Sequence, residues 1–193
     1  MIHRRELLQR TSILLGGSLL GADSLLAKHI DWDAIDAAPD DAGIGLFTKQ
    51  QIRLLNEIAD TIIPTTDTPG AKAAKVGQFI AVYVSDCLEA EEQTTFLGGL
   101  AALDARCKKD LGKSFRKCSA VQRRDYLTTL DREWKTGNHN DASFFFTRMK
   151  ELTLWGYFTS ETGCTQAQRM VEIPGRYEGC VPYAKGERAW GGY

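Results

Sequence analysis

The chain has 193 residues, of which 43% are apolar and 25% are charged, the balance of an ordinary globular protein. That length suits one domain with a single core, after allowance for a targeting segment. The formal net charge of −1 gives no support for nucleic-acid binding, which usually needs a strongly basic face. No apolar run reaches the length of about 18 residues that a membrane-spanning helix needs.

Residues 1–27 are predicted to be an export signal of the twin-arginine (Tat) type. Arg4 and Arg5 precede a short, glycine-containing apolar segment, 13–22, and this pattern is typical of signals that carry folded cargo. The alternative is a surface helix that happens to begin with two arginines. Export would place the protein in the periplasm, and an uncut signal would keep it at the periphery of the inner membrane.

Residues 28–45 are polar and acidic and contain Pro39, which predicts a linker or a loosely packed arm. The domain proper, 46–193, is predicted to be all-α. It has no proline between Gly70 and Ile173, and no alternating segments bounded by Asn-Gly or Asp-Gly turns, so hairpins are not expected. We predict a compact bundle of about five to six helices that ends in an irregular tail, roughly 174–193.

Capping motifs and the helical spacing of apolar residues set the predicted helix bounds. Residues 48–51 form a capping box and begin a first helix that runs to Ile62. Gly98 and Gly99 weaken the third helix, which indicates that another helix or chain approaches closely there. The other helices are expected over 69–88 and 91–111, from Ser119, from Asp141 to Phe158, and in a short segment capped by 165–168.

The chain is organised around a corner within residues 58–80. Pro64 lacks an N–H and its ring clashes with the preceding turn, so the first helix must stop near Ile62. The side chains of residues 65–68 then offer oxygens to free backbone N–H groups. Thr68 and Pro69 form a suitable N-cap and first-turn pair, which predicts that the second helix begins at Pro69.

Aromatic residues crowd both ends of the fifth helix. Residues 144–146 are three consecutive phenylalanines, and Trp155, Tyr157 and Phe158 follow at the other end, so the rings must point to more than one side. Such a helix is either central in its fold or partly covered by a partner, for which aromatic residues are favoured anchors. The glycine-rich, aromatic tail after Pro174 is predicted to wrap its own domain or to dock on another protein.

The sequence contains none of the standard catalytic or cofactor-binding patterns. It has no glycine-rich phosphate loop, no CxxCH haem motif, no CxxC pair, no Glu-x-x-His pair and no GxSxG nucleophile. A Cys–His dyad using His139 is left open. Glu57 and Asp60, one turn apart, are interpreted as a solvated acidic face rather than an acid/base pair. No catalytic, cofactor-binding or metal-binding residue is therefore predicted.

Five cysteines are an odd count for an exported protein, so at most two internal disulfides can form. Cys164 and Cys180 flank the segment that follows the fifth helix, and a bridge between them would pin the tail. Alternatively, one of them bridges to a different chain, or the cysteines are buried free thiols.

Three segments carry a resemblance to a known family. The corner at 58–80, the helix end at 152–163 and the tail at 174–183, followed by Ala189 and Trp190, resemble the gluconate 2-dehydrogenase subunit 3 family in this order. The resemblance covers about residues 46–190, and the twin-arginine start also fits it.

The resemblance implies a small, non-catalytic subunit without a cofactor of its own. Its implied partner is a large FAD-dependent sugar, sugar-acid or glycoside dehydrogenase of the glucose–methanol–choline (GMC) type, often with a cytochrome c subunit that carries haem c. The small subunit would bind and stabilise this partner in the cytoplasm and escort it through the Tat translocon already folded. A stand-alone periplasmic ligand-binding module and an unrecognised enzyme are the alternatives.

The resemblance also implies which residues contact the partner or hold the motifs. The corner residues among them could instead serve only the internal fold. The implied contact residues are Pro64, Thr66, Asp67, Pro69, Gly70, Trp155, Tyr157, Phe158, Glu161, Tyr177 and Trp190. The further motif positions are Gly156, Ser160, Gly163, Pro174, Gly175, Gly179, Cys180 and Pro182.

Overall fold

The structure is a computed structural model of the chain, and it describes residues 43–191 except 172, 174 and 176–178. These residues belong to the second of two units, Ala38–Tyr193. The predicted export signal with Arg4 and Arg5, most of the acidic linker, Pro174 and Tyr177 lie outside the described residues.

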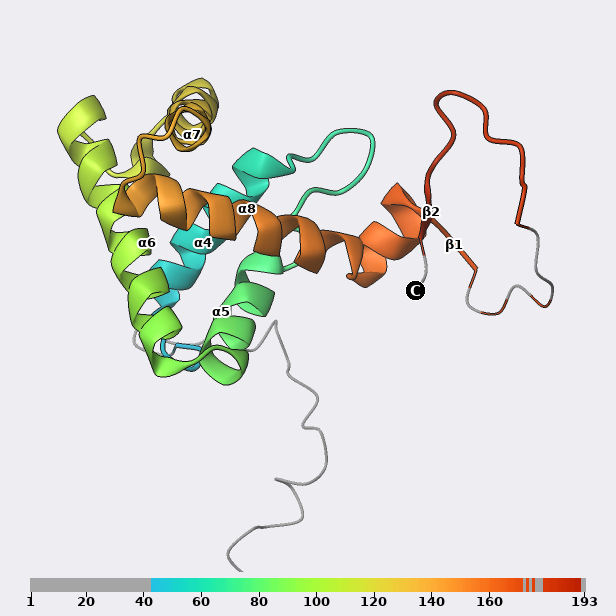
Figure 1. Cartoon of the computed structure of the whole chain (residues 1–193), viewed down its shortest axis with the longest axis horizontal. Helices are drawn as coiled ribbons and strands as arrows, with labels where there is room; N and C mark the ends of the chain where they lie inside the picture. Colours follow the sequence, from blue (N-terminus) through green and yellow to red (C-terminus); the bar gives the residue numbers. More distant parts are fainter. Residues whose placement is uncertain (1–42, 172, 174, 176–178, 192–193) are drawn as a thin grey trace, which may run out of the picture. The chain divides into compact units, whose positions relative to one another are not determined.

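The described chain is built from helices, which confirms the all-α prediction (Figure 1). Five α-helices are accompanied by a 3₁₀ turn, η2 (Phe115–Lys117), and a π-helical turn, η3 (Gly163–Ala167). Two strands of two residues each, β1 (Arg169–Met170) and β2 (Trp190–Gly191), pair in parallel near the chain's end. The α-helices are α4 (Lys49–Ile62), α5 (Val76–Cys87), α6 (Ala90–Leu111), α7 (Ala120–Lys135) and α8 (Asp141–Phe158).

Local capping motifs begin several helices as the sequence predicts. The Thr48 hydroxyl accepts from the Gln51 N–H at 3.3 Å, and the Gln51 side chain accepts from the Thr48 N–H at 2.9 Å. A second reciprocal box joins Ser119 and Gln122 at the start of α7. These bonds satisfy backbone donors that have no partner inside the helix, so both starts are fixed by residues three positions apart.

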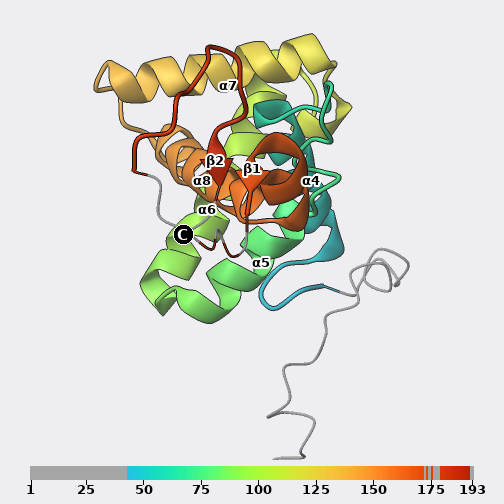
Figure 2. The same cartoon turned by 90° about the vertical axis from the view of Figure 1, so that its right-hand side faces the viewer.

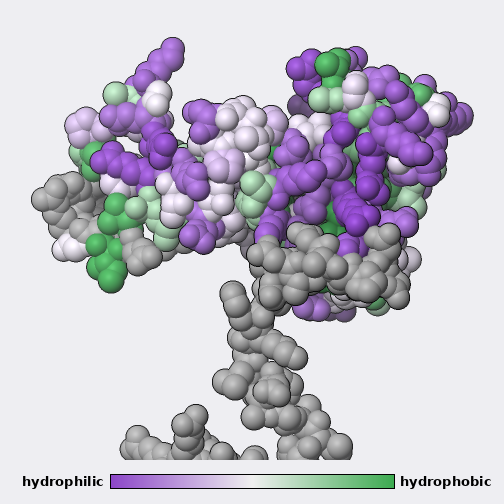
Figure 3. All heavy atoms as spheres, turned by 180° about the vertical axis from the view of Figure 1, so that it is seen from behind, coloured by the Kyte–Doolittle hydropathy of each residue, from purple (hydrophilic) through white to green (hydrophobic). Residues whose placement is uncertain are grey.

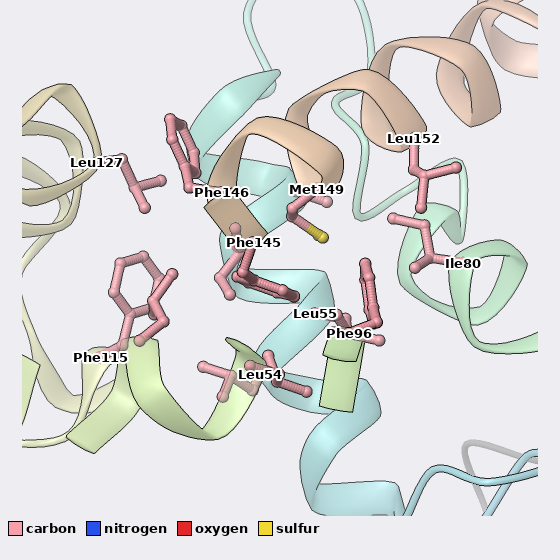
Figure 4. Close-up of a cluster of buried hydrophobic side chains, with 14 of the residues drawn as sticks. Leu54, Leu55, Ile80, Phe96, Phe115, Leu127, Phe145, Phe146, Met149 and Leu152 are labelled. Carbon is pink, nitrogen blue, oxygen red and sulfur yellow. The ribbon is translucent and has the colours of Figure 1, made fainter. Parts of the chain in front are cut away.

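Helix α8 lies at the centre of the bundle and packs against α4, α5, α6 and α7. Its buried face carries Phe145, Phe146, Met149 and Leu152, which meet apolar side chains of the surrounding helices in one core (Figure 4). The three consecutive phenylalanines therefore divide, since Phe144 is 42% exposed while the next two are buried. Of the two alternatives for this helix, the central position is confirmed, and part of its aromatic surface faces outward.

The close approach predicted from Gly98 and Gly99 is found at Gly99 alone. A Cβ atom at Gly99 would lie 2.5 Å from Cβ of Phe145 on α8, whereas nothing lies within 4 Å of the same position at Gly98. The absence of a side chain at Gly99 thus lets α6 and α8 pack directly against each other.

The predicted start of α5 at Pro69 is wrong, because the helix begins at Val76. Residues 71–75 form turns, and Lys75 takes a left-handed conformation with φ 54°. The buried Asn56 of α4 accepts a hydrogen bond from the Gly77 N–H at 3.1 Å and so caps α5 from another helix. This tertiary cap prevails over the local cap offered by Thr68.

The predicted last helix is also displaced. Residues 165–168 do not begin a helix there; the turn η3 starts at Gly163 and ends at Ala167. Gly163 has no room for a side chain, because a Cβ atom there would lie 1.8 Å from the carbonyl oxygen of Tyr157. The chain therefore folds back tightly on the end of α8 before it enters the tail.

Candidate partner-docking surface

The corner between α4 and α5 is closed by its own backbone. The Ala71 N–H donates to the Ile63 carbonyl at 2.9 Å, and the Gly70 N–H donates to the Thr65 hydroxyl at 3.0 Å. A Cβ atom at Gly70 would lie 2.7 Å or less from backbone atoms on three preceding residues. Gly70 is therefore required by close packing inside the corner.

The end of α8 is tied to this corner through Tyr157. Its ring is buried, and its hydroxyl donates a 2.7 Å hydrogen bond to the carbonyl oxygen of Pro69, 88 positions away in the sequence. Two of the three motif segments therefore meet in space. Tyr157 and Gly70, both inferred above as partner contacts, face the interior of this chain.

The tail reaches the same corner electrostatically. The Thr66 hydroxyl donates to the Asp67 carboxylate at 2.8 Å, and this bond is the main cause of a pKa of Asp67 below its usual value. Arg188 in the tail adds a weaker attraction to the same carboxylate. The corner, the end of α8 and Arg188 of the tail thus lie near one another.

An aromatic cluster of Phe79, Tyr83 and Trp155 lies on the α5–α8 face. The Trp155 ring meets both other rings edge-on, with centroid distances of 5.3 Å to Phe79 and 5.0 Å to Tyr83. Trp155 remains 46% exposed. A Cβ atom at Gly156 would lie 2.5 Å from the Phe79 ring, so this glycine makes room for the cluster. The next outward residue, Leu154, is also exposed.

The tail begins beyond η3 and returns beside it. The two short strands β1 and β2 pair side by side (Figure 2). The Arg169 N–H donates to the Ala189 carbonyl at 2.8 Å, and the Arg169 guanidinium lies 4.3 Å from the ring centroid of Trp190. This short segment places several apolar side chains at the surface. The exposed large apolar residues of the described tail are Met170, Val171, Ile173, Val181, Tyr183 and Trp190.

Figure 3 shows, from behind, largely hydrophilic residues over much of the bundle and a group of hydrophobic residues among hydrophilic and intermediate ones at the tail. Isolated surface apolar residues are normal, but a gathering of them marks an interaction site. We therefore take the aromatic cluster and the tail, both at the C-terminal end of α8, as the candidate docking surface.

The implied contact residues divide by orientation. Pro64, Thr66, Asp67, Trp155, Glu161 and Trp190 are exposed. Pro69 and Phe158 are half-buried, Gly70 and Tyr157 are buried, and Tyr177 lies outside the described residues. The sequence reasoning missed Phe79 and Tyr83, although their spacing of four positions on a helix places both rings on one face.

Glu57, predicted to lie with Asp60 on a solvated acidic face, is instead partly buried and paired with basic side chains. The Glu57 side chain is only 20% exposed, and its carboxylate binds Lys72 at 2.6 Å and also pairs with Arg123 of α7. Partial burial opposes its ionisation, but the two basic partners prevail and hold the pKa of Glu57 below its usual value. Glu57 is thus a structural anion that joins α4 to α7, and the prediction of a solvated face is wrong for it.

All five cysteines lie among the described residues and all are free thiols. Cys164 is half-buried with its Sγ 3.2 Å from the Phe158 carbonyl oxygen, and Cys180 is exposed, so the structure gives no support to a bridge between them. Within the described part of the chain, no group of three or more His, Cys, Asp or Glu residues is placed to hold a metal ion. Among the same residues, no helix is long and apolar enough to cross a membrane.

Comparison with known proteins supports the resemblance over the corner, the helix end and the start of the tail segment. The family model described as gluconate 2-dehydrogenase subunit 3 matches residues 49–175, which contain all five α-helices and the first strand. No curated protein matches the chain. No solved structure matches it either. The match covers well over half of the sequence, and the chain therefore belongs to the gluconate 2-dehydrogenase subunit 3 family.

Proposed function

We propose that this protein is the small, non-catalytic subunit of a periplasmic dehydrogenase complex. It binds and stabilises a large FAD-dependent subunit of the GMC type, which oxidises a sugar, a sugar acid or a glycoside. A cytochrome c subunit with haem c is a third component in some complexes of this kind. The FAD and the active site belong to the large subunit. The family is that of a dehydrogenase subunit, which supports the assignment to such a complex.

The observation that carries the proposal is the docking surface at the end of α8. Trp155 and Trp190 are about half exposed and each is held by packing against its own chain, through the aromatic cluster and through Arg169. Rigid, amphipathic aromatic side chains of this kind are typical interface anchors, because little conformational entropy is lost when they are covered.

Escort through the twin-arginine translocon is the second part of the proposal. Arg4 and Arg5 form the signal on which it depends. A domain that folds around its own buried core can bind a partner in the cytoplasm and travel with it in the folded state. Replacing both arginines with lysine is expected to leave this protein and its dehydrogenase activity in the cytoplasm. Normal periplasmic dehydrogenase activity in that variant would contradict the escort role.

The decisive test of docking is a tagged pull-down from the native host. We expect a yellow complex with a flavin spectrum, in which mass spectrometry finds a GMC-type flavoprotein in nearly equal amount. Trp155→Ala should reduce the recovered flavin several-fold, because truncating a buried anchor commonly weakens binding by about 2 kcal/mol or more. Val121→Ala is the matched control, since Val121 is 59% exposed on α7 and outside the docking surface.

Two outcomes would count against the proposal. A colourless chain recovered alone, with no flavoprotein, would contradict the subunit role and favour a stand-alone module; a saturable thermal shift with a small molecule would then identify its ligand. Equal loss of flavin in Trp155→Ala and Val121→Ala would contradict the assignment of the docking surface.

A further inference from the structure

Two cysteines lie side by side in the core, away from the docking surface. Cys107 belongs to the last turns of α6, and Cys118 directly follows η2. Their sulfur atoms are 3.7 Å apart, and their side chains are 0% and 3% exposed, respectively. The other three cysteines are half-buried or exposed.

The two thiols are held together by contacts that do not involve sulfur. The Asp104 carboxylate on α6 accepts hydrogen bonds from the Ser114 hydroxyl at 2.7 Å and from the Phe115 N–H at 2.9 Å. The Phe115 ring is fully buried beside them. These contacts fix the segment containing η2 against α6, so the Cys118 side chain is directed toward Cys107 before any bond forms.

We propose that Cys107 and Cys118 are the site of a reversible intramolecular disulfide bond. A disulfide needs its sulfur atoms about 2.05 Å apart, so the two sulfurs must approach each other by less than roughly 2 Å. Small rotations of the two side chains can supply much of this movement. The site is independent of the proposed function, although an oxidising compartment would favour the disulfide over the two thiols.

The oxidation is a thiol–disulfide exchange with a disulfide-bearing oxidant, such as oxidised glutathione. One cysteine thiolate attacks a sulfur of the oxidant, which forms a mixed disulfide and releases one glutathione thiolate. The second cysteine thiolate attacks the protein sulfur of that mixed disulfide and releases the second glutathione. The protein loses two electrons and two protons, and the oxidant gains both.

Burial sets the conditions under which this exchange proceeds. Burial, together with the neighbouring Cys118 thiol, raises the pKa of the Cys107 thiol to about 12. Because the thiolate is the attacking species, the closed fold protects the pair from oxidation at neutral pH. Exchange therefore requires the segment between α6 and α7 to open locally, so both formation of the disulfide and its reduction in the folded protein should be slow.

The test uses the purified full-length protein, incubated with oxidised glutathione or with dithiothreitol, then denatured and alkylated with N-ethylmaleimide. Intact mass should show five alkylated cysteines after dithiothreitol, the full number in the sequence, and at most three after oxidation, with two cysteines that carry neither N-ethylmaleimide nor glutathione. Cleavage before aspartate places Cys107 and Cys118 on separate peptides, 104–109 and 110–124. After oxidation these two peptides should be recovered joined, and dithiothreitol should separate them.

Variants separate the disulfide from non-specific oxidation. Oxidation should raise the melting temperature of the wild type and of the exposed-cysteine control Cys87→Ser by roughly 5–10 °C. It should leave that of Cys118→Ser unchanged. Five alkylated cysteines in the oxidised wild type, glutathione adducts without joined peptides, or joining of Cys118 to another cysteine would each overturn the proposal, and none of these readouts depends on a dehydrogenase partner.

Discussion

Alanine at two adjacent glycines of α6 should change stability in opposite directions. Gly99 is buried against α8, where an added Cβ would lie 2.5 Å from Cβ and 3.0 Å from Cγ of Phe145. Gly98 is exposed, and nothing lies within 4 Å of its added Cβ. Both residues have negative φ, so the comparison isolates packing from backbone strain.

The magnitudes follow from helix propensity and packing. Replacing a helical glycine with alanine stabilises by about 1 kcal/mol, and Gly98→Ala should show this full gain. Gly99→Ala has the same intrinsic gain, but it forces a methyl group into a filled core, which typically destabilises by about 1–3 kcal/mol. Phe145 is 1% exposed and its ring packs edge-on against Phe96 with centroids 4.9 Å apart, so it has little room to move. We expect the upper end of that range and a net loss at Gly99.

Urea unfolding followed by far-ultraviolet circular dichroism measures both free energies of unfolding under the same conditions. Gly98→Ala should lie above the wild type and Gly99→Ala below it. The double variant Gly99→Ala/Phe145→Ala tests the cause, because Gly99→Ala should be less destabilising once the ring atoms at 3.0 and 3.2 Å are gone, although the Cβ of residue 145 at 2.5 Å remains. Equal stabilisation by both single alanine variants would refute the close approach of α6 to α8.

Three further predictions concern the corner and its supports. Thr48→Ala removes the N-cap of α4 and should lower the free energy of unfolding by about 1 kcal/mol, measured by urea unfolding. Tyr157→Phe removes the hydrogen bond to the Pro69 carbonyl and should lower it by roughly 1–3 kcal/mol, with faster amide hydrogen exchange across 63–71. Glu57→Gln should be less stable than the wild type at pH 7, because the lowered pKa means that the native fold favours the ionised carboxylate. The difference in the free energy of unfolding between the two proteins is complete above the carboxyl's ordinary pKa. It should shrink as the pH falls through the lowered pKa of Glu57. A pH-independent difference in urea midpoints would contradict the ion-pair role.

Sequence reasoning succeeded where the determining contacts are local. The capping boxes at Thr48 and Ser119 join side chains and backbone three positions apart, so the pattern alone locates the helix starts. It failed at α5, where Thr68 offered an equally good local cap. The actual cap is the Asn56 side chain, which is 21 positions away from Gly77 and could only be found once α4 and α5 were packed.

The candidate site shows the same division. The motif segments identified stretches that the structure brings together at the end of α8, but not which way each side chain points. Tyr157 and Trp155 are both aromatic residues at one helix end, yet one is 1% exposed and the other 46%. The pair Phe79 and Tyr83 has the spacing of a helical face, and that pattern fits a core face as well as a surface one. Only their contact with an exposed tryptophan from α8 identifies a surface cluster.

The fold and the docking surface are coupled through the residues that face inward. Tyr157 holds the Pro69 carbonyl and so positions the corner against the end of α8, from which the tail departs. A substitution at Tyr157 would therefore weaken partner binding even if its side chain never touched a partner. Trp155 lies two residues earlier, is 46% exposed and packs against the side-chain rings of Phe79 and Tyr83. Loss of binding in Trp155→Ala with unchanged unfolding of the free subunit would identify direct contact, whereas loss in Tyr157→Phe would report only that the corner had loosened.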